Sequence, residues 1–138
     1  MENSDYLKNL NENQLEAVKT IDGPVMVFAG AGTGKTRTLI SRIVYMIKEC
    51  NIQPYHILAI TFTKKATNEM RERLEKQIES KAKFVHISTI HSLCANILRR
   101  NATYLDYGRN FEVIDEEDQV KILNEIYKLS LIHISEPT

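Results

Sequence analysis

A glycine-rich run at residues 29–36 constrains this chain more than any other feature of its sequence. The run reads Ala-Gly-Ala-Gly-Thr-Gly-Lys-Thr and fits the pattern GxxxxGK(S/T), with alanine in the first position. An apolar run, Val-Met-Val-Phe at residues 25–28, precedes it. A stripe of apolar residues with helical spacing follows it, at Leu39, Ile40, Ile43, Val44 and Ile47. This order predicts a buried parallel strand, a tight turn and then a helix.

The glycine run also predicts a particular chemistry. Its glycines let the backbone aim successive amide groups inward at the positive end of a helix dipole, which forms a nest for phosphate groups. We expect the Lys35 ammonium to contact β and γ phosphates and the Thr36 hydroxyl to bind a bridging Mg²⁺, so both are candidate catalytic residues. The alternative is a glycine-rich turn without a ligand. The candidate nucleotide-binding residues here are Ala29, Gly30, Ala31, Gly32, Thr33, Gly34, Lys35, Thr36 and Arg37.

The rest of the chain alternates between strand and helix patterns. A short helix around Leu15 precedes the turn at residues 22–24, and an apolar run at 57–60 precedes a helix with Ala66, Met70, Leu74 and Ile78 on one face. A third strand is predicted at 85–88, before a helix through Leu93, Ile97 and Leu98. Asp115 can cap a last helix whose apolar face holds Val120, Leu123, Ile126 and Tyr127. Such alternation predicts an α/β domain with a parallel sheet flanked by helices.

Composition narrows the class of protein. The chain has 138 residues, 43% of them apolar and 26% charged, as in one soluble globular domain. No apolar run approaches the roughly 20 residues of a membrane helix, and the first residues do not form a secretory signal, so we expect a cytoplasmic location and no membrane partner. Cys50 and Cys94 are too far apart for a CxxC pair, and no HxH or HExxH run is present. We therefore expect reduced thiols and no metal site made by protein ligands alone.

The charges are segregated although the formal net charge is zero. Residues 31–100 hold 13 Lys and Arg against 5 Asp and Glu, while the two flanks together hold 5 against 13. A basic middle segment permits binding to phosphate-rich partners such as nucleic acids. The alternative is a set of solvated helix faces that differ in sign.

Three further blocks accompany the glycine run in a characteristic order. They read Leu-Asn-Glu-Asn-Gln-Leu-Glu-Ala-Val at 10–18, Ile-Thr-Phe-Thr-Lys-Lys-Ala-Thr-Asn-Glu-Met at 60–70, and Ile-Ser-Thr-Ile-His-Ser-Leu-Cys at 87–94. Together they resemble the UvrD/PcrA/Rep-type helicases of superfamily 1, over about residues 7–123. The resemblance implies a truncated P-loop NTPase (RecA-like) fold with the start of a helical insertion. It also implies ATP and Mg²⁺ as cofactors.

The first block is similar to the Q motif of that family, whose glutamine reads adenine. Gln14 is the matching residue. A carboxamide suits this role because it donates and accepts hydrogen bonds at once, which matches the N7 and N6 edge of adenine. The alternative is a solvent-facing helix residue.

The second block resembles motif Ia, which lines the single-stranded DNA path in the family. Phe62, Thr63 and Lys64 are the DNA-binding candidates, since an aromatic ring stacks on any base and a helix start holds phosphate. Lys64 stands where the family usually has Asn, and Thr67 stands where Ala is usual. The alternative for Phe62 is a core aromatic residue.

The third block resembles the family's Ib block, with Ile90 in place of the usual Phe. Thr89, His91 and Ser92 match and are DNA-binding candidates. The alternative for His91 is a buried histidine whose hydrogen bonds are satisfied, and we assign it no proton-transfer role.

The resemblance implies the first part of a motor that hydrolyses ATP to move 3′ to 5′ along single-stranded DNA and separate strands in repair or replication. Its partners are single-stranded and partly duplex DNA. Hydrolysis also requires a carboxylate pair and arginines from a second domain, and this sequence has no matching segment. The acidic group at residues 115–118 follows no long apolar strand, and Asp115 fits better as a helix cap. We therefore expect this chain to lack competent hydrolysis.

Three alternatives stay open: the motor of a helicase-nuclease, a P-loop phosphotransferase, and a nucleotide-binding module without a DNA role. The domain boundaries carry a separate expectation. Residues 129–138, Leu-Ser-Leu-Ile-His-Ile-Ser-Glu-Pro-Thr, match codon for codon the transposase-type sequencing adapter CTGTCTCTTATACACATCTCCGAGCCCACG. We expect residues 1–128 to form the N-terminal part of the ATP-binding domain and 129–138 to be a non-native tail.

Overall fold

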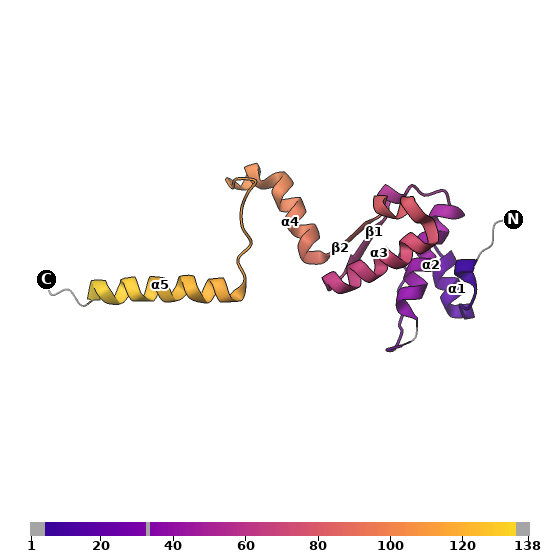
Figure 1. The fold of residues 1–138 in the computed structure, drawn as a ribbon, viewed down its shortest axis with the longest axis horizontal. Helices are drawn as coiled ribbons and strands as arrows, with labels where there is room; N and C mark the ends of the chain where they lie inside the picture. Colours follow the sequence, from indigo (N-terminus) through magenta and orange to yellow (C-terminus); the bar gives the residue numbers. More distant parts are fainter. Residues whose placement is uncertain (1–4, 33, 135–138) are drawn as a thin grey trace. The chain divides into compact units, whose positions relative to one another are not determined.

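The computed structural model describes residues 5–32 and 34–134. Its main elements, drawn in Figure 1, are α1 (Glu12–Lys19), α2 (Lys35–Lys48), β1 (Leu58–Thr61), α3 (Lys64–Ile78), β2 (His86–Thr89), α4 (Ile90–Asn101) and α5 (Glu116–Ile134). Short 3₁₀ turns lie at Asp5–Leu7, Pro54–His56, Glu79–Phe84 and Ala102–Leu105. The chain forms two compact units, Met1–Ala95 and Asn96–Thr138, and each is described by itself. No helix in the described ranges is long and apolar enough to cross a membrane.

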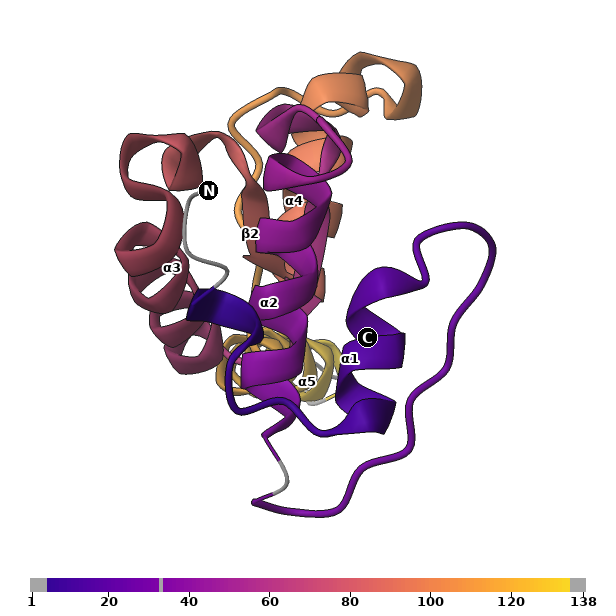
Figure 2. The same cartoon turned by 90° about the vertical axis from the view of Figure 1, so that its right-hand side faces the viewer.

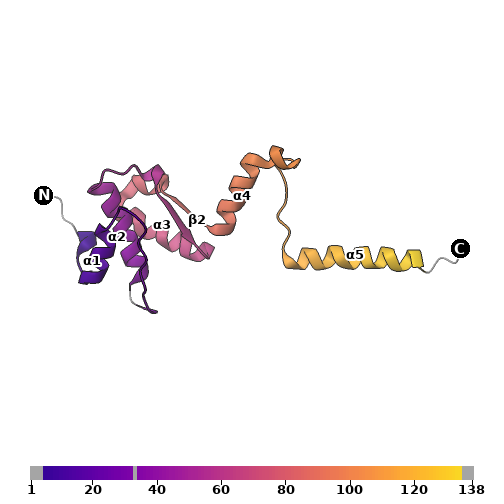
Figure 3. The same cartoon turned by 180° about the vertical axis from the view of Figure 1, so that it is seen from behind.

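The sheet of the first unit consists of β1 and β2, which run parallel. Leu58 pairs with His86 and Thr61 with Thr89, so the carboxyl ends of the two strands lie at the same edge. Helix α3 connects the strands and packs against both of them, as Figure 1 and the rear view in Figure 3 show. The predicted parallel pairing is confirmed for these two strands, and each begins one residue later than the sequence pattern indicated.

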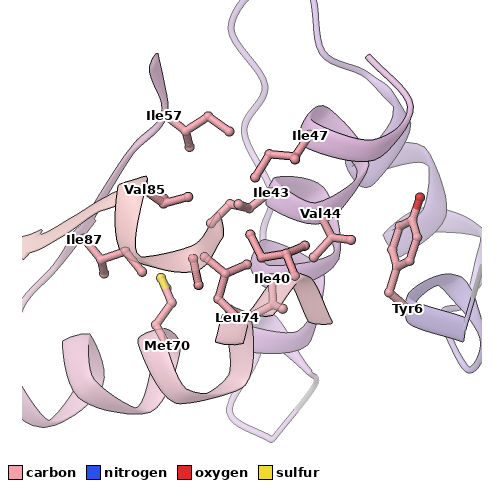
Figure 4. Packing of buried hydrophobic residues seen from close by; sticks show 12 residues of the cluster. Tyr6, Ile40, Ile43, Val44, Ile47, Ile57, Met70, Leu74, Val85 and Ile87 are labelled. Carbon is pink, nitrogen blue, oxygen red and sulfur yellow. The ribbon is translucent and has the colours of Figure 1, made fainter. Parts of the chain in front are cut away.

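The core of the first unit lies between α2, α3 and the sheet (Figure 4). The predicted apolar stripes of both helices supply most of it, since periodic apolar residues place one helix face toward a common core. The main contributors are Ile40, Ile43, Val44 and Ile47 from α2, Met70, Leu74 and Ile78 from α3, Ile87 from β2, and Val85 just before it. Most of both stripes was predicted correctly because it depends on local spacing, but Leu39 is 48% exposed and Ala66 lies outside the core.

Tyr6 fastens the amino-terminal turn to α2. Its hydroxyl donates to Glu49 Oε1 at 3.2 Å, and Ser41 Oγ donates to the Tyr6 carbonyl oxygen at 2.8 Å. Burial of the phenol, followed by the nearby Glu49 carboxylate, raises the pKa of Tyr6 to about 12. The amino-terminal turn is thereby held against the middle and the carboxyl end of α2.

The predicted strand at residues 25–28 is wrong for this structure. This segment has no strand pairing among the described residues, and its side chains are between 39% and 91% exposed. Figure 2 shows the connection between α1 and α2 looping away from both helices. An apolar strand is stable only when neighbouring strands accept its hydrogen bonds and helices cover its faces. In the described sheet, β1 and β2 pair only with each other.

The second unit contains the last predicted helix. Asp115 Oδ1 accepts the backbone N–H of Asp118 at 2.9 Å, so Asp115 caps α5 as predicted. The expected apolar face of α5 is exposed, at Val120, Leu123, Ile126 and Tyr127. Helix α5 continues into residues 129–134, and residues 135–138 lie outside the described part of the chain.

Candidate nucleotide and DNA site

The glycine run forms the turn that starts α2, as predicted. Gly34 is the N-cap with a left-handed φ of 78°, and Gly32 has a φ of 74°. Glycine adopts such angles without the steric strain that a Cβ causes. Gly34 has no side chain to cap this helix start, and the first amide groups lie at the positive end of a 14-residue helix. This geometry fits an anionic phosphate group. Thr33 lies outside the described residues.

A hollow of about 500 Å³ lies beside this turn. It is lined by Asn9, Gln14, Gly32, Gly34, Lys35, Thr36, Arg37 and Arg73. The structure thus brings Gln14, from the first sequence block, together with the predicted phosphate-binding residues. A hollow of this size and polarity has room for the phosphates of a nucleotide.

Two other predicted nucleotide-binding residues, Ala29 and Gly30, do not line this hollow. They line a neighbouring hollow of about 460 Å³, which shares Gln14 and Lys35 with the first and is bordered by α1, α2 and the segment at 25–28. Ala31 lines neither of these hollows. The glycine run is divided in this way because its first residues follow a segment that no neighbouring strand holds in place.

Gln14 is oriented by the start of α1. Its Oε1 accepts the backbone N–H of Asn11 at 3.0 Å, and Asn11 Oδ1 accepts the backbone N–H of Gln14 at 2.9 Å, which together form a capping box. A Cβ added to Gly34 would lie 3.2 Å from Gln14 Nε2, so the carboxamide lies against the glycine turn. The alternative of a solvent-facing residue is therefore wrong here.

Replacing Gln14 with glutamate is expected to raise the ratio of ATP to GTP affinity by about tenfold, because the carboxylate still accepts from the N6 amino group of adenine and repels O6 of guanine, while the lost N–H donor to N7 affects both bases. Glutamate keeps the acceptor of the capping box, so the melting temperature is expected to stay the same. The added negative charge repels both nucleotides alike, and the ratio therefore isolates base recognition. Fluorescence titration with both nucleotides measures it. An unchanged ratio in the variant would contradict the adenine-reading role.

The DNA-binding candidates lie at the carboxyl edge of the sheet. Phe62 and Thr63 follow β1, while His91 and Ser92 follow β2, and the register of Thr61 with Thr89 brings the two sets to one edge. The Phe62 side chain is 93% exposed, and His91 is also exposed. A core aromatic residue at Phe62 and a buried histidine at His91, both left open by the sequence, are therefore wrong.

The hydroxyl groups at this edge cap helices. Thr63 Oγ1 accepts the backbone N–H of Ala66 at 3.1 Å at the start of α3. Thr89 Oγ1 accepts the backbone N–H of Ser92 at 3.2 Å and donates to Ser92 Oγ at 2.9 Å. These bonds fix how the two helices start, and Phe62, Lys64 and His91 are exposed beside them.

Thr67, which departs from the family pattern, makes hydrogen bonds at this edge of the sheet. Its Oγ1 lies 2.6 Å from the Oγ1 of buried Thr61 and donates to the Thr63 carbonyl oxygen at 3.2 Å. The hydroxyl therefore ties α3 to the end of β1 and holds the turn that carries Phe62. An alanine at this position has no such hydrogen bonds, so the sequence departure adds local rigidity.

Comparison with known proteins places the chain in a family. Residues 10–136 match the family described as UvrD/REP helicase N-terminal domain. The chain is 47% identical over 122 residues to the ATP-dependent DNA helicase PcrA of Staphylococcus aureus, and equally to that of Staphylococcus epidermidis. Each alignment covers 88% of this chain and 17% of the relative, so the chain spans a small part of those proteins. With the loop, Gln14 and the sheet edge in the expected order, the chain belongs to the UvrD/REP helicase N-terminal domain family.

Proposed function

We propose that this chain is the N-terminal nucleotide- and DNA-binding part of an ATP-dependent 3′ to 5′ DNA helicase. The observation that carries the proposal is the hollow where Gln14 meets Lys35 and Thr36. A base-reading amide next to a phosphate-binding turn suits an adenine nucleotide better than a free phosphate. The parallel pair of β1 and β2 and the loop before α2 support a RecA-like P-loop fold for the parent protein.

Nucleotide binding is assigned to the turn and the first residues of α2. The backbone amides at the uncapped helix start and the Lys35 ammonium hold the phosphates, and the half-buried Thr36 hydroxyl is the protein's ligand for Mg²⁺. Arg37 lines the same hollow. Bound ATP with Mg²⁺ supplies the phosphoanhydride bond whose hydrolysis drives a motor of this class.

DNA binding is assigned to the carboxyl edge of the sheet. The exposed ring of Phe62 offers a stacking face for a base, and Lys64 adds a positive charge for the neighbouring phosphate. His91 is an exposed hydrogen-bonding group at the same edge. Thr63, Thr89 and Ser92 hold the helix starts that position these groups, by the caps described above.

We propose that this chain binds ATP without competent hydrolysis. Water activation requires a positioned carboxylate, and Asp115, which begins the acidic group at 115–118, caps α5 instead. Among the described residues, no acidic side chain lines the hollow beside Lys35 and Thr36. Single-stranded DNA is therefore expected to produce no stimulation of phosphate release by the isolated chain.

The test measures binding of a fluorescent oligothymidylate by anisotropy at 50 mM and 200 mM salt, with phosphate release followed in parallel. We expect measurable binding at low salt that weakens by about tenfold at the higher salt, since a few phosphate contacts release counterions. Absence of binding at 50 mM salt, with ATP still bound, would contradict the DNA role and favour a nucleotide-binding module. DNA-stimulated ATP turnover would contradict the proposed inactivity.

We also propose that residues 129–138 are encoded by a sequencing adapter, on the strength of the codon match alone. Reading the source DNA across these codons tests this proposal. Genomic sequence that continues through them without the adapter would contradict it.

A further inference from the structure

The hollow beside the glycine turn has one cationic residue that belongs to none of the sequence blocks. Arg73 lies on α3, and its side chain lines the hollow together with Lys35, Thr36 and Arg37. Its side chain is exposed, and within residues 5–32 and 34–134 its guanidinium makes no hydrogen bond or ion pair. An arginine that lines a hollow together with other cations, and that has no partner among the described residues, is available to bind an anion.

The charges around this hollow are all of one sign. In the described part of the chain, its lining contains Lys35, Arg37 and Arg73 and no carboxylate. Like charges gathered in one place repel each other and so disfavour this arrangement. An anion bound between them removes that repulsion, and the guanidinium fork matches the oxygens of a phosphate group.

The backbone of Arg73 is held firmly. Its neighbour Leu74 is fully buried, and Met70, one turn earlier, is also in the core. Arg71 donates from Nη2 to the Ile87 carbonyl oxygen at 3.2 Å, which fastens this part of α3 to β2. Arg73 therefore presents its side chain from a fixed position on the rim of the hollow rather than from a loop.

We infer that Arg73 contacts the phosphates of the nucleotide bound at the glycine turn, as a second cationic group beside Lys35. The inference rests on the proposed nucleotide binding and adds a residue from α3 to that site. A phosphate target fits better than the base, because adenine is neutral and a guanidinium group pairs with the charged oxygens of a phosphate. The contact does not involve the base, so the affinities for ATP and GTP are expected to depend on it equally.

The experiment uses the full chain and titrates fluorescently labelled ATP and GTP into four proteins: the unchanged chain, Arg73→Gln, Arg73→Lys and Lys76→Gln. Lys76 is the matched control, since it lies one turn further along α3 and does not line the hollow. Arg73→Gln is expected to weaken both nucleotides by about tenfold with an unchanged ATP to GTP ratio. Arg73→Lys is expected to recover part of the loss, and Lys76→Gln to bind within twofold of the unchanged chain. Thermal melting verifies that each variant is folded.

The outcomes separate this inference from the proposed function. If the unchanged chain binds neither nucleotide, both are wrong. If it binds ATP and Arg73→Gln binds as tightly as Lys76→Gln, the nucleotide site stands and the assignment of Arg73 is wrong. A shift in the ATP to GTP ratio in Arg73→Gln would place the contact at the base and would overturn the phosphate assignment.

Discussion

Replacing Lys35 with alanine is expected to weaken ATP binding by about a hundredfold, because the phosphates lose a charge-assisted contact. Lys35 is the first residue of α2, so its ammonium acts at the positive end of that helix. The turn itself is fixed by Gly32 and Gly34, whose left-handed angles do not depend on the lysine. The variant should therefore remain folded and lose only the ligand. Isothermal titration with ATP and Mg²⁺ measures the change in dissociation constant.

The matched control for this change is Lys19→Ala. Lys19 is an exposed lysine in the last turn of α1 and lines none of the hollows beside the glycine turn. Removing it changes the net charge by the same amount, so a general electrostatic effect would appear in both variants. Similar affinities in Lys35→Ala and Lys19→Ala would show that the helix start does not bind the phosphates through Lys35.

Local pattern predicted the helices and the two paired strands of this fold well. The apolar stripes of α2 and α3 each depend on spacing within a single helix. They are buried as expected from Ile40 to Ile47 and from Met70 to Ile78, while Leu39 at the start of the first stripe is exposed. Asp115 capped α5 for the same local reason. Residues 25–28 have an equally clear apolar run but no strand, because a strand depends on partners that the run itself does not specify.

The candidate site could be predicted only in part, for a related reason. The glycine turn and Gln14 were found because each is part of a recognisable run of residues. Arg73 was missed because an arginine on a helix has no distinguishing neighbours in sequence, and only the packing of α3 brings it to the hollow. The hydrogen bond between Thr61 and Thr67 was missed likewise, since nothing in the spacing indicates that the two hydroxyls meet.

Phe62 provides the second large expected effect. Its ring is 93% exposed, yet the turn that carries it is held by the Thr61, Thr63 and Thr67 hydroxyl contacts. A large apolar side chain kept in water by a rigid turn is unfavourable for the free protein and favourable once a base covers it. Phe62→Ala is therefore expected to weaken oligothymidylate binding by about thirtyfold at low salt, within the range of one lost base stack. Fluorescence anisotropy measures the loss.

Two further variants make this expectation specific to the ring and to its position. Phe62→Tyr retains a stacking face and is expected to bind DNA within threefold of the unchanged chain. Phe84→Ala removes another exposed aromatic ring, 54% accessible, from the turn before β2. Because the strands are parallel, that turn lies at the amino edge of the sheet, opposite the edge that carries Phe62. A nonspecific effect of exposed aromatic rings does not distinguish the two edges of the sheet. Equal losses of DNA affinity in Phe62→Ala and Phe84→Ala would therefore contradict a DNA site at the carboxyl edge.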